Sequence, residues 1–191
     1  MVLTLPLQVA FAADDPALPA AGSGLFKFEL TNLPSSSRFG EPGISVNKNG
    51  RIIVNTFGPS VWVSTDNGKI FSKALNLGPQ DTTCAAGHGS SGDADAVVAF
   101  DNTFYVENLC LPTVGGAGND VFVNRKDGDP SAWSTPPTVA VGDVDRGWLA
   151  PDPQTAGTVY LSYHSFENLT INVLKSTDFG ATFLCPRTGL P

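Results

Sequence analysis

The chain has 191 residues, of which 41% are hydrophobic and 15% are charged; 35 are Gly or Pro (20 plus 15), about 18% against roughly 12% in average proteins. So many turn-forming residues exclude a helical bundle or coiled coil, while the apolar fraction and the aromatic residues (12 Phe, 3 Tyr, 3 Trp) argue against disorder. The net charge of −7 argues against a nucleic-acid partner, and no stretch approaches the ~20 apolar residues of a membrane-spanning helix.

The first residues of the chain resemble an export signal. Residues 2–9 form a short apolar stretch, and Ala10, Phe11 and Ala12 match the A-x-A pattern that precedes cleavage. The usual basic segment before the apolar stretch is missing, and the alternative is a disordered apolar N-terminus. The sequence therefore predicts an extracellular or periplasmic protein with a signal peptide over 1–13, a linker over 14–24 and a folded part over 25–191.

The folded part repeats with a period of about fifty residues. The first acidic residues of three aligned units stand 52 positions apart twice (93 − 41 and 145 − 93), and the units cover 41–54, 93–106 and 145–161. Each contains an acidic residue, an apolar strand, a turn and a second strand, and a third strand follows at 60–64, 120–123 and 170–174. Four short strands per repeat are typical of β-propeller blades. A β-sandwich is the alternative for so many short strands.

The turn between the third and fourth strands repeats a motif of the form S-x-D-x-G-x-x-aromatic. Its two copies are defined by Ser64, Asp66, Gly68, Phe71, Ser176, Asp178, Gly180 and Phe183. The Asp carboxylate should accept hydrogen bonds from N–H groups two or three residues on, the Ser hydroxyl should add another, and Gly should adopt φ > 0. The aromatic ring should fold under the turn into the core. A degenerate copy over 124–128, with Trp133 further on, has its Asp displaced to the position before the Gly.

These turns resemble the Asp-box, or bacterial neuraminidase repeat, of the sialidase-like β-propellers. The resemblance covers about 39–183 and implies an all-β fold, a β-propeller segment of about three four-stranded antiparallel blades. It also implies that the Asp-box residues are structural and peripheral, because turn geometry alone explains their Asp. Closed propellers have at least four blades, so we expect an N-terminal fragment whose partners include the remaining blades of the same protein.

In a propeller the innermost strand of each blade lines a central channel, and ligands meet the loops at one mouth. The candidate site residues therefore stand at the starts of the blades, at Arg38, Glu41, Asp93, Asp95, Asp143, Asp145 and Arg146. Converging carboxylates with arginines between them would suit a glycan, a metal ion or a small carboxylate ligand. The alternative is that each Asp holds its own strand to a neighbouring blade. No cofactor is predicted: calcium stays an alternative that nothing in the sequence supports, and no C-x-x-C or Cys/His spacing supports a zinc site.

The resemblance to sialidases implies a particular catalytic set. Three arginines would hold the sialic acid carboxylate, an Asp would serve as acid/base, and a Tyr activated by a Glu would be the nucleophile. The first of those arginines lies in a Phe-Arg-Ile-Pro-like motif, and the nearest segment here, around Arg38, has a different order and spacing. Tyr105, Tyr160 and Tyr163 fall on second strands as expected core residues. The catalytic residues therefore stay unassigned.

The three cysteines fit an oxidising compartment. Cys84 and Cys110 flank one predicted strand pair and are expected to form a disulfide, which leaves Cys185 with a partner outside this sequence. His88 lies in a Gly/Ser-rich segment that is expected to be a loop, and His164 is expected to be structural.

Two functions fit this sequence. The first is an exported glycan-directed propeller, an exo-sialidase-type glycoside hydrolase or a glycan-binding protein when full length, with the fragment inactive alone. The second is a non-catalytic propeller that acts as a scaffold or protein-interaction module. The fold does not decide between them, whereas three channel-facing arginines with a late Tyr and Glu would favour the enzyme.

Overall fold

The structure is a computed structural model that describes residues 33, 42–56, 60–76, 88–112, 117–135 and 138–185, all within one compact unit of the chain, Leu33–Pro191. Over these residues the chain forms strands and turns without a helix, and hence without any helix able to cross a membrane. The predicted all-β class is confirmed. The predicted signal peptide and linker, over 1–24, lie outside the described residues.

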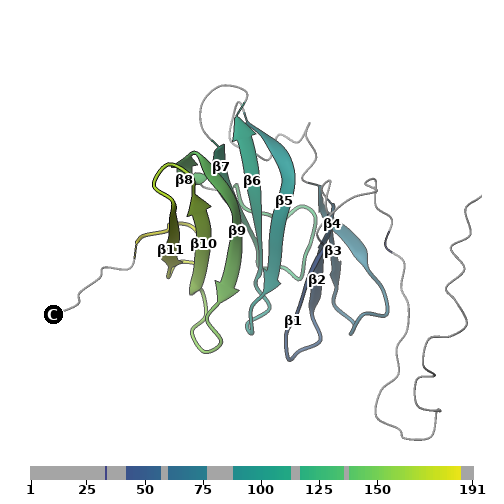
Figure 1. Ribbon diagram of the computed structural model, residues 1–191. Coiled ribbons are helices and arrows are strands. Elements are labelled where there is room, and N and C mark those ends of the chain that lie inside the picture. The colour runs from purple at the N-terminus through teal and green to yellow at the C-terminus, as the bar shows by residue number, and fades with distance from the viewer. Residues whose placement is uncertain are drawn as a thin grey trace, which may run out of the picture. The chain divides into compact units, whose positions relative to one another are not determined.

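Among the described residues, eleven strands form three antiparallel sheets that follow one another along the chain (Figure 1). The first sheet comprises β1 (Gly43–Val46), β2 (Ile52–Thr56), β3 (Ser60–Ser64) and β4 (Ser72–Asn76). The second comprises β5 (His88–Val98), β6 (Phe104–Pro112), β7 (Ala117–Asn124) and β8 (Thr138–Gly142). The third comprises β9 (Val144–Pro151), β10 (Val159–Ser165) and β11 (Thr170–Ser176). Each strand pairs with its neighbours in sequence, so every sheet is a meander.

The strands lie where the repeat predicts them. The predicted third strands fall within β3, β7 and β11. Along β2, Ile53 and Asn55 are buried while their neighbours are half-buried, which is the alternation of a strand whose two faces differ. In the third sheet, an antiparallel bridge between Lys175 and Leu184 stands where a fourth strand follows in the other two sheets. The period of the sequence is therefore the period of the sheets.

The strand β5 begins earlier than the sequence predicts. The Gly/Ser-rich segment with His88, expected to be a loop, instead pairs in antiparallel register, with residues 88–90 opposite 110–112 of β6. The register then shifts between Ser90 and Ala94, as it does at a β-bulge. Glycine is common where a strand bends in this way. The Gly/Ser-rich composition that predicts a loop is therefore that of an irregular strand.

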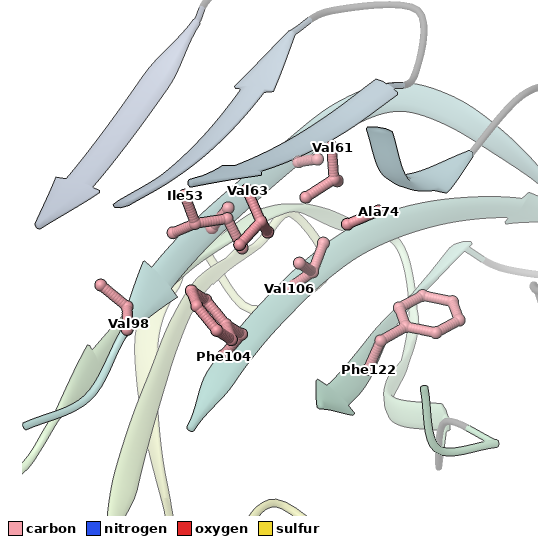
Figure 2. Packing of buried hydrophobic residues seen from close by; sticks show 10 residues of the cluster. Ile53, Val61, Val63, Ala74, Val98, Phe104, Val106 and Phe122 are labelled. Carbon is pink, nitrogen blue, oxygen red and sulfur yellow. The ribbon is translucent and has the colours of Figure 1, made fainter. Parts of the chain in front are cut away.

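Two clusters of buried side chains lie between the sheets. The first cluster joins the first and second sheets (Figure 2) and consists of Ile53, Val61, Val63, Ala74, Ala94, Ala96, Val98, Phe104, Val106 and Phe122. The second joins the second and third sheets and consists of Ala99, Tyr105, Val121, Val123, Val139, Leu149, Val159, Leu161 and Leu174. Full burial of one large apolar side chain stabilises the fold by roughly 1.5–3 kcal/mol, so both junctions are substantial.

The strand β6 contributes to both clusters. Phe104 and Val106 belong to the first cluster and Tyr105 to the second, because successive side chains of a strand point to opposite faces. The strand is thus buried on both sides, which explains the apolar runs at its two ends, on either side of Glu107 and Asn108. The second sheet packs between the first and the third.

Candidate functional site

The first strands of neighbouring sheets contact one another, β5 with β1 and β9 with β5 (Figure 1). These are the strands on which the repeat predicts a channel lining. The junction of the second and third sheets carries four of the candidate residues on β5 and β9, namely Asp93, Asp95, Asp145 and Arg146. Asp143 is an exposed residue just before β9, and Arg38 and Glu41 lie outside the described residues.

Asp95 connects the second sheet to the third. Its Oδ2 accepts a hydrogen bond from the Leu149 N–H of β9 at 2.7 Å, and its Oδ1 accepts one from the Ala96 N–H at 3.0 Å. Burial raises the pKa of this carboxyl, and the two N–H groups oppose the rise. Asp95 therefore fits the alternative given for the acids at the starts of the blades, in which each Asp holds its own strand to a neighbouring blade.

Glu107 is a second carboxyl at this junction, and unlike Asp95 it is fully buried; the sequence does not single it out. It lies on β6 with 0% of its surface exposed, and neither carboxyl oxygen has a hydrogen-bond partner of good geometry among the described residues. A Cβ at Gly147 of β9 would lie 3.0 Å from the Glu107 Cγ, so the glycine leaves the space that this side chain fills. Burial raises the pKa of Glu107 well above its ordinary range, against the smaller opposing effect of the Gly147 N–H. The site therefore favours the protonated acid.

The other candidates complete a group of opposite charges. The Asp145 Oδ1 accepts a hydrogen bond from the Arg146 N–H at 2.8 Å. The Arg146 guanidinium lies over the ring of Trp148, 5.2 Å from its centroid. The charge of Arg146 lowers the pKa of Glu107, whereas the charge of Asp93 raises it, so both groups lie near the buried acid. The junction thus combines several carboxyls with a guanidinium and an aromatic ring.

The two S-x-D-x-G turns have the same hydrogen bonds. In the first, the Ser64 Oγ donates to Asp66 Oδ1 at 2.8 Å and accepts from the Gly68 N–H at 2.9 Å. The Asp66 Oδ1 accepts from the Ile70 N–H at 3.0 Å. The same three bonds recur in the second turn at 2.8, 2.8 and 2.9 Å among Ser176, Asp178, Gly180 and Thr182. The Ser hydroxyl therefore caps the turn, while the Asp binds an N–H four residues on rather than two or three as expected.

These bonds lower the pKa of both turn carboxyls. For Asp66 the largest cause is the hydrogen bond from the Ile70 N–H, and for Asp178 it is the Thr182 hydroxyl, which donates to Oδ2 at 2.6 Å. Because the folded pKa lies below the unfolded value of 3.8, the stabilisation is complete at neutral pH and is lost as the pH falls through the folded pKa. These Asp residues act as structural acceptors.

The degenerate turn over 124–128 keeps this shape with other residues. The Asn124 Oδ1 accepts from the N–H groups of Lys126 and Gly128 at 2.8 and 3.1 Å. Asp127 has φ 51° and Gly128 has φ 80°, close to the 62° and 81° of the last two residues of the first turn. Lys126 thus stands where the motif has its Asp, and Asp127 lies at the position before the Gly, as the sequence indicates. An amide oxygen replaces the Ser hydroxyl because both can accept the same N–H groups.

The glycines of these turns pack against the preceding sheet. A Cβ at Gly128 would lie 2.8–2.9 Å from three atoms of Val63, and one at Gly180 would lie 3.0 Å from the Val123 Cγ2. Both glycines have φ near 80°, so they combine a left-handed backbone with a close approach. Each turn is therefore a contact between sheets as well as a hairpin end.

Charged and aromatic side chains reinforce the same contacts. The Arg51 Nε donates to Asp127 Oδ1 at 2.9 Å, which joins the first sheet to the degenerate turn over 124–128. The Arg125 guanidinium lies 3.9 Å from the centroid of the Phe179 ring in the third sheet's turn, a cation–π contact. The Trp133 Nε1 donates to the Ala74 carbonyl at 3.0 Å. Of the motif aromatics, Phe183 packs against the second cluster, in line with the sequence.

Replacing Ser176 with alanine should lower the free energy of unfolding by about 1 kcal/mol. The change removes the acceptor for the Gly180 N–H and the donor to Asp178, and loss of a capping hydroxyl typically costs about 0.5–2 kcal/mol. Urea denaturation measures the difference. The exposed Thr177, replaced by alanine, is the matched control and should change stability by less than about 0.5 kcal/mol. Equal effects at the two positions would contradict the capping role.

The structure tests only part of the predicted cysteine pairing. Cys110 is buried and disulfide-bonded, while Cys185 is exposed and free. Cys84 lies outside the described residues, so its pairing with Cys110 stays a prediction. Within the described ranges, His, Cys, Asp and Glu side chains form no group of three that could hold a metal ion.

Comparison with known proteins establishes the fold. No protein-family model and no curated protein matches the sequence. A Hadza microbial sialidase, Hz136, is similar in structure with a TM-score of 0.54 and 14% identity, over 77% of this chain and 33% of the sialidase. A Penicillium chrysogenum α-L-arabinanase complexed with arabinobiose has a TM-score of 0.57 and 14% identity, over 78% of this chain and 49% of the enzyme. Both are β-propellers, so the three sheets are propeller blades rather than parts of a sandwich, and the chain spans less than half the length of either structure.

Proposed function

We propose that this chain is the blade segment of an exported, glycan-directed propeller of the sialidase-like, Asp-box type. The observation that carries the proposal is the Arg146 guanidinium over the Trp148 ring on β9, beside the carboxyls of the second blade. A guanidinium binds a carboxylate through two parallel hydrogen bonds, and an aromatic ring offers an apolar face to a sugar. Together they suit an acidic sugar such as a sialic acid.

The repeated turns support the Asp-box assignment. Ser64 and Ser176 cap their turns in the same way, and Asn124 does so in the turn between them. Three turns with one geometry, each at the same place in its blade, are what a blade-by-blade repeat requires. The structural likeness to a sialidase and an arabinanase supports a glycan as the class of ligand, because both printed names denote enzymes that act on glycans.

The nucleophile of a sialidase-type reaction is not supplied by Tyr105. Its hydroxyl is buried without a hydrogen-bond partner among the described residues, and burial raises its pKa well above the ordinary value of 10.0. A nucleophilic Tyr needs a base beside it to take its proton. We therefore propose that the described blades bind the ligand. Hydrolysis would need a nucleophile other than Tyr105, supplied by the full-length protein.

Replacing Arg146 with alanine should weaken binding of a sialic acid glycoside at least about tenfold, the effect of removing a charge-assisted pair. Titration calorimetry of the chain with sialyllactose measures binding, and an aryl sialoside that releases a fluorophore measures turnover. The matched control is Arg125→Ala, because Arg125 contacts Phe179 at a peripheral turn and should not affect the ligand. No binding and no turnover by the wild-type protein would refute the proposal.

A non-catalytic scaffold is the second candidate, and Asp95 favours it. Both oxygens of this carboxyl accept backbone hydrogen bonds, one of them from the neighbouring blade, so its role is structural. If the protein is such a scaffold, neither the wild type nor Arg146→Ala should bind the glycan in the titration. The same titration therefore separates the two functions.

A further inference from the structure

The second strand of each of the first two blades carries a buried polar side chain against the next blade. In β2 this residue is Asn55, whose Nδ2 donates to the Ala94 carbonyl of β5 at 2.9 Å. In β6 it is Glu107, whose Cγ would lie 3.0 Å from a Cβ at Gly147 of β9. Asn55 and Glu107 are each the fourth residue of their strand, and 2% and 0% of their surfaces are exposed. The two positions are therefore equivalent.

This equivalence shows that a junction between blades does not need an acid at the position of Glu107. The neutral amide of Asn55 joins the first two blades by a hydrogen bond. A buried carboxyl, by contrast, costs free energy when it is ionised without a partner. Neither oxygen of Glu107 has a hydrogen-bond partner of good geometry among the described residues. The contact between blades thus does not explain why residue 107 is an acid.

Charged groups from two neighbouring strands lie near Glu107. Asp95 lies directly opposite it in the register of β5 and β6, and Asp93 stands two residues earlier on β5. Asp145 and Arg146 come from β9. Burial raises the pKa of Glu107 most, the charges of Asp95 and Asp93 raise it further, and the charge of Arg146 lowers it. Glu107 therefore stays neutral to a higher pH than an exposed glutamate.

The other strands packed against Glu107 present neutral groups, as far as the described residues show. On β7 the residue opposite Glu107 is Val121, and Asp120 points to the other face of the sheet because successive side chains alternate. On β10, Tyr163 lies opposite Gly147. Burial raises the pKa of Tyr163 from the usual 10.0, so its hydroxyl is neutral at physiological pH. The charge at this junction thus depends on the acids of β5, on β9 and on Glu107 itself.

We propose that Glu107 is a specificity residue of the glycan site. An acidic sugar held by Arg146 brings another carboxylate to a junction that already contains Asp93 and Asp95. A neutral Glu107 adds nothing to the repulsion among these groups, whereas an ionised Glu107 adds a further negative charge. The ligand therefore binds the form of the protein in which Glu107 is neutral. This inference rests on the proposed function, because it needs an acidic ligand at Arg146.

Titration calorimetry of the whole chain with sialyllactose at about pH 5 and about pH 8 tests the inference. The carboxyl of the ligand and the guanidinium of Arg146 are ionised at both pH values. The dissociation constant of the wild type should rise with pH as Glu107 ionises. Glu107→Gln keeps a neutral side chain of the same length. We expect the ratio of the two dissociation constants to be about tenfold greater in the wild type than in this variant, a typical coupling between two sites.

Proton uptake gives a second readout that a merely structural role would not move. Titrations in buffers of different ionisation enthalpy should show that the wild type takes up part of a proton with each ligand, because the ligand favours neutral Glu107. Glu107→Gln should lack this part. The matched control is Glu167→Gln, which makes the same chemical change at an exposed residue and should keep the wild-type ratio and uptake. Asp95 and His164 are present in all three proteins, so the comparison isolates Glu107.

Failure of this inference and failure of the proposed function give different results. If the wild type does not bind sialyllactose at either pH, both are refuted. If it binds, and Glu107→Gln has the same ratio and the same proton uptake, the glycan site stands and the role of Glu107 is refuted. Loss of binding by Glu107→Gln at the lower pH would also refute that role, because a neutral side chain should suffice there. Far-UV circular dichroism at both pH values should show all three proteins folded.

Discussion

Replacing Gly128 with alanine should lower the free energy of unfolding by about 3 kcal/mol, whereas the same change at Gly68 should lower it by only about 1 kcal/mol. The two glycines hold the same position in their turns, with φ of 80° and 81°. An alanine therefore has the same left-handed backbone strain at both. The difference lies in their surroundings, because a Cβ at Gly128 would lie 2.8–2.9 Å from three Val63 atoms, including the Val63 Cβ.

The space at Gly68 is larger. There the nearest atom to a new Cβ would be the end of the Ile52 side chain at 3.2 Å, which can move a few tenths of an ångström. Val63 is branched at its own Cβ and buried in the first cluster, so it cannot withdraw in this way. Urea denaturation of both variants gives the two losses and their difference. Equal losses would show that the turn over 124–128 does not depend on close packing against the first blade.

Replacing Glu107 with glutamine should make the protein more stable at alkaline pH and little different in acid. Burial raises the folded pKa of Glu107 well above its unfolded value of 4.5, so its contribution to stability is complete below 4.5 and is lost as the pH rises through the folded pKa. Over that window the wild type loses about 1.4 kcal/mol per pH unit through this group. Glutamine has no proton to lose, and its stability advantage should grow at that rate.

Chemical denaturation at about pH 5 and about pH 8 measures this slope. Asp95 also has a raised pKa from burial and contributes a slope of its own to both proteins, so the comparison isolates Glu107. Glu167→Gln is the matched control, because it makes the same chemical change at an exposed residue of the turn before β11. Parallel pH curves for Glu107→Gln and the wild type would contradict a buried acid that titrates.

The turns were predictable from the sequence because their interactions are local. Ser64, Asp66 and Gly68 lie within five residues, so spacing alone indicates which groups can meet. The turn over 124–128 was harder to recognise from the sequence, because Asn124 replaces the Ser of the motif. Its amide oxygen accepts the equivalent N–H groups that the Ser hydroxyl accepts in the other two turns. A sequence motif specifies a residue type, whereas the backbone of this turn requires only a side-chain hydrogen-bond acceptor at position 124, which Asn provides as well as Ser.

The junction of the second and third blades was only partly predictable. Asp95 could be placed at the start of a blade, but its bond to the Leu149 N–H joins residues 54 positions apart and depends on how two sheets meet. Glu107 gave no signal, because an acid within a strand is ordinarily expected to face solvent. Its burial follows from Gly147 on another blade, whose missing side chain leaves room for it.

The bonds between blades also bear on the order in which the chain can fold. Asn55 donates to the Ala94 carbonyl, Trp133 to the Ala74 carbonyl and the Leu149 N–H to Asp95, and each bond joins a blade to the next one. A repeat protein held by nearest-neighbour contacts can nucleate in one unit and propagate to the next. During synthesis each finished blade can therefore serve as the template for its successor. The apolar side chains that the last blade exposes at any moment are the surface on which the following hairpins condense.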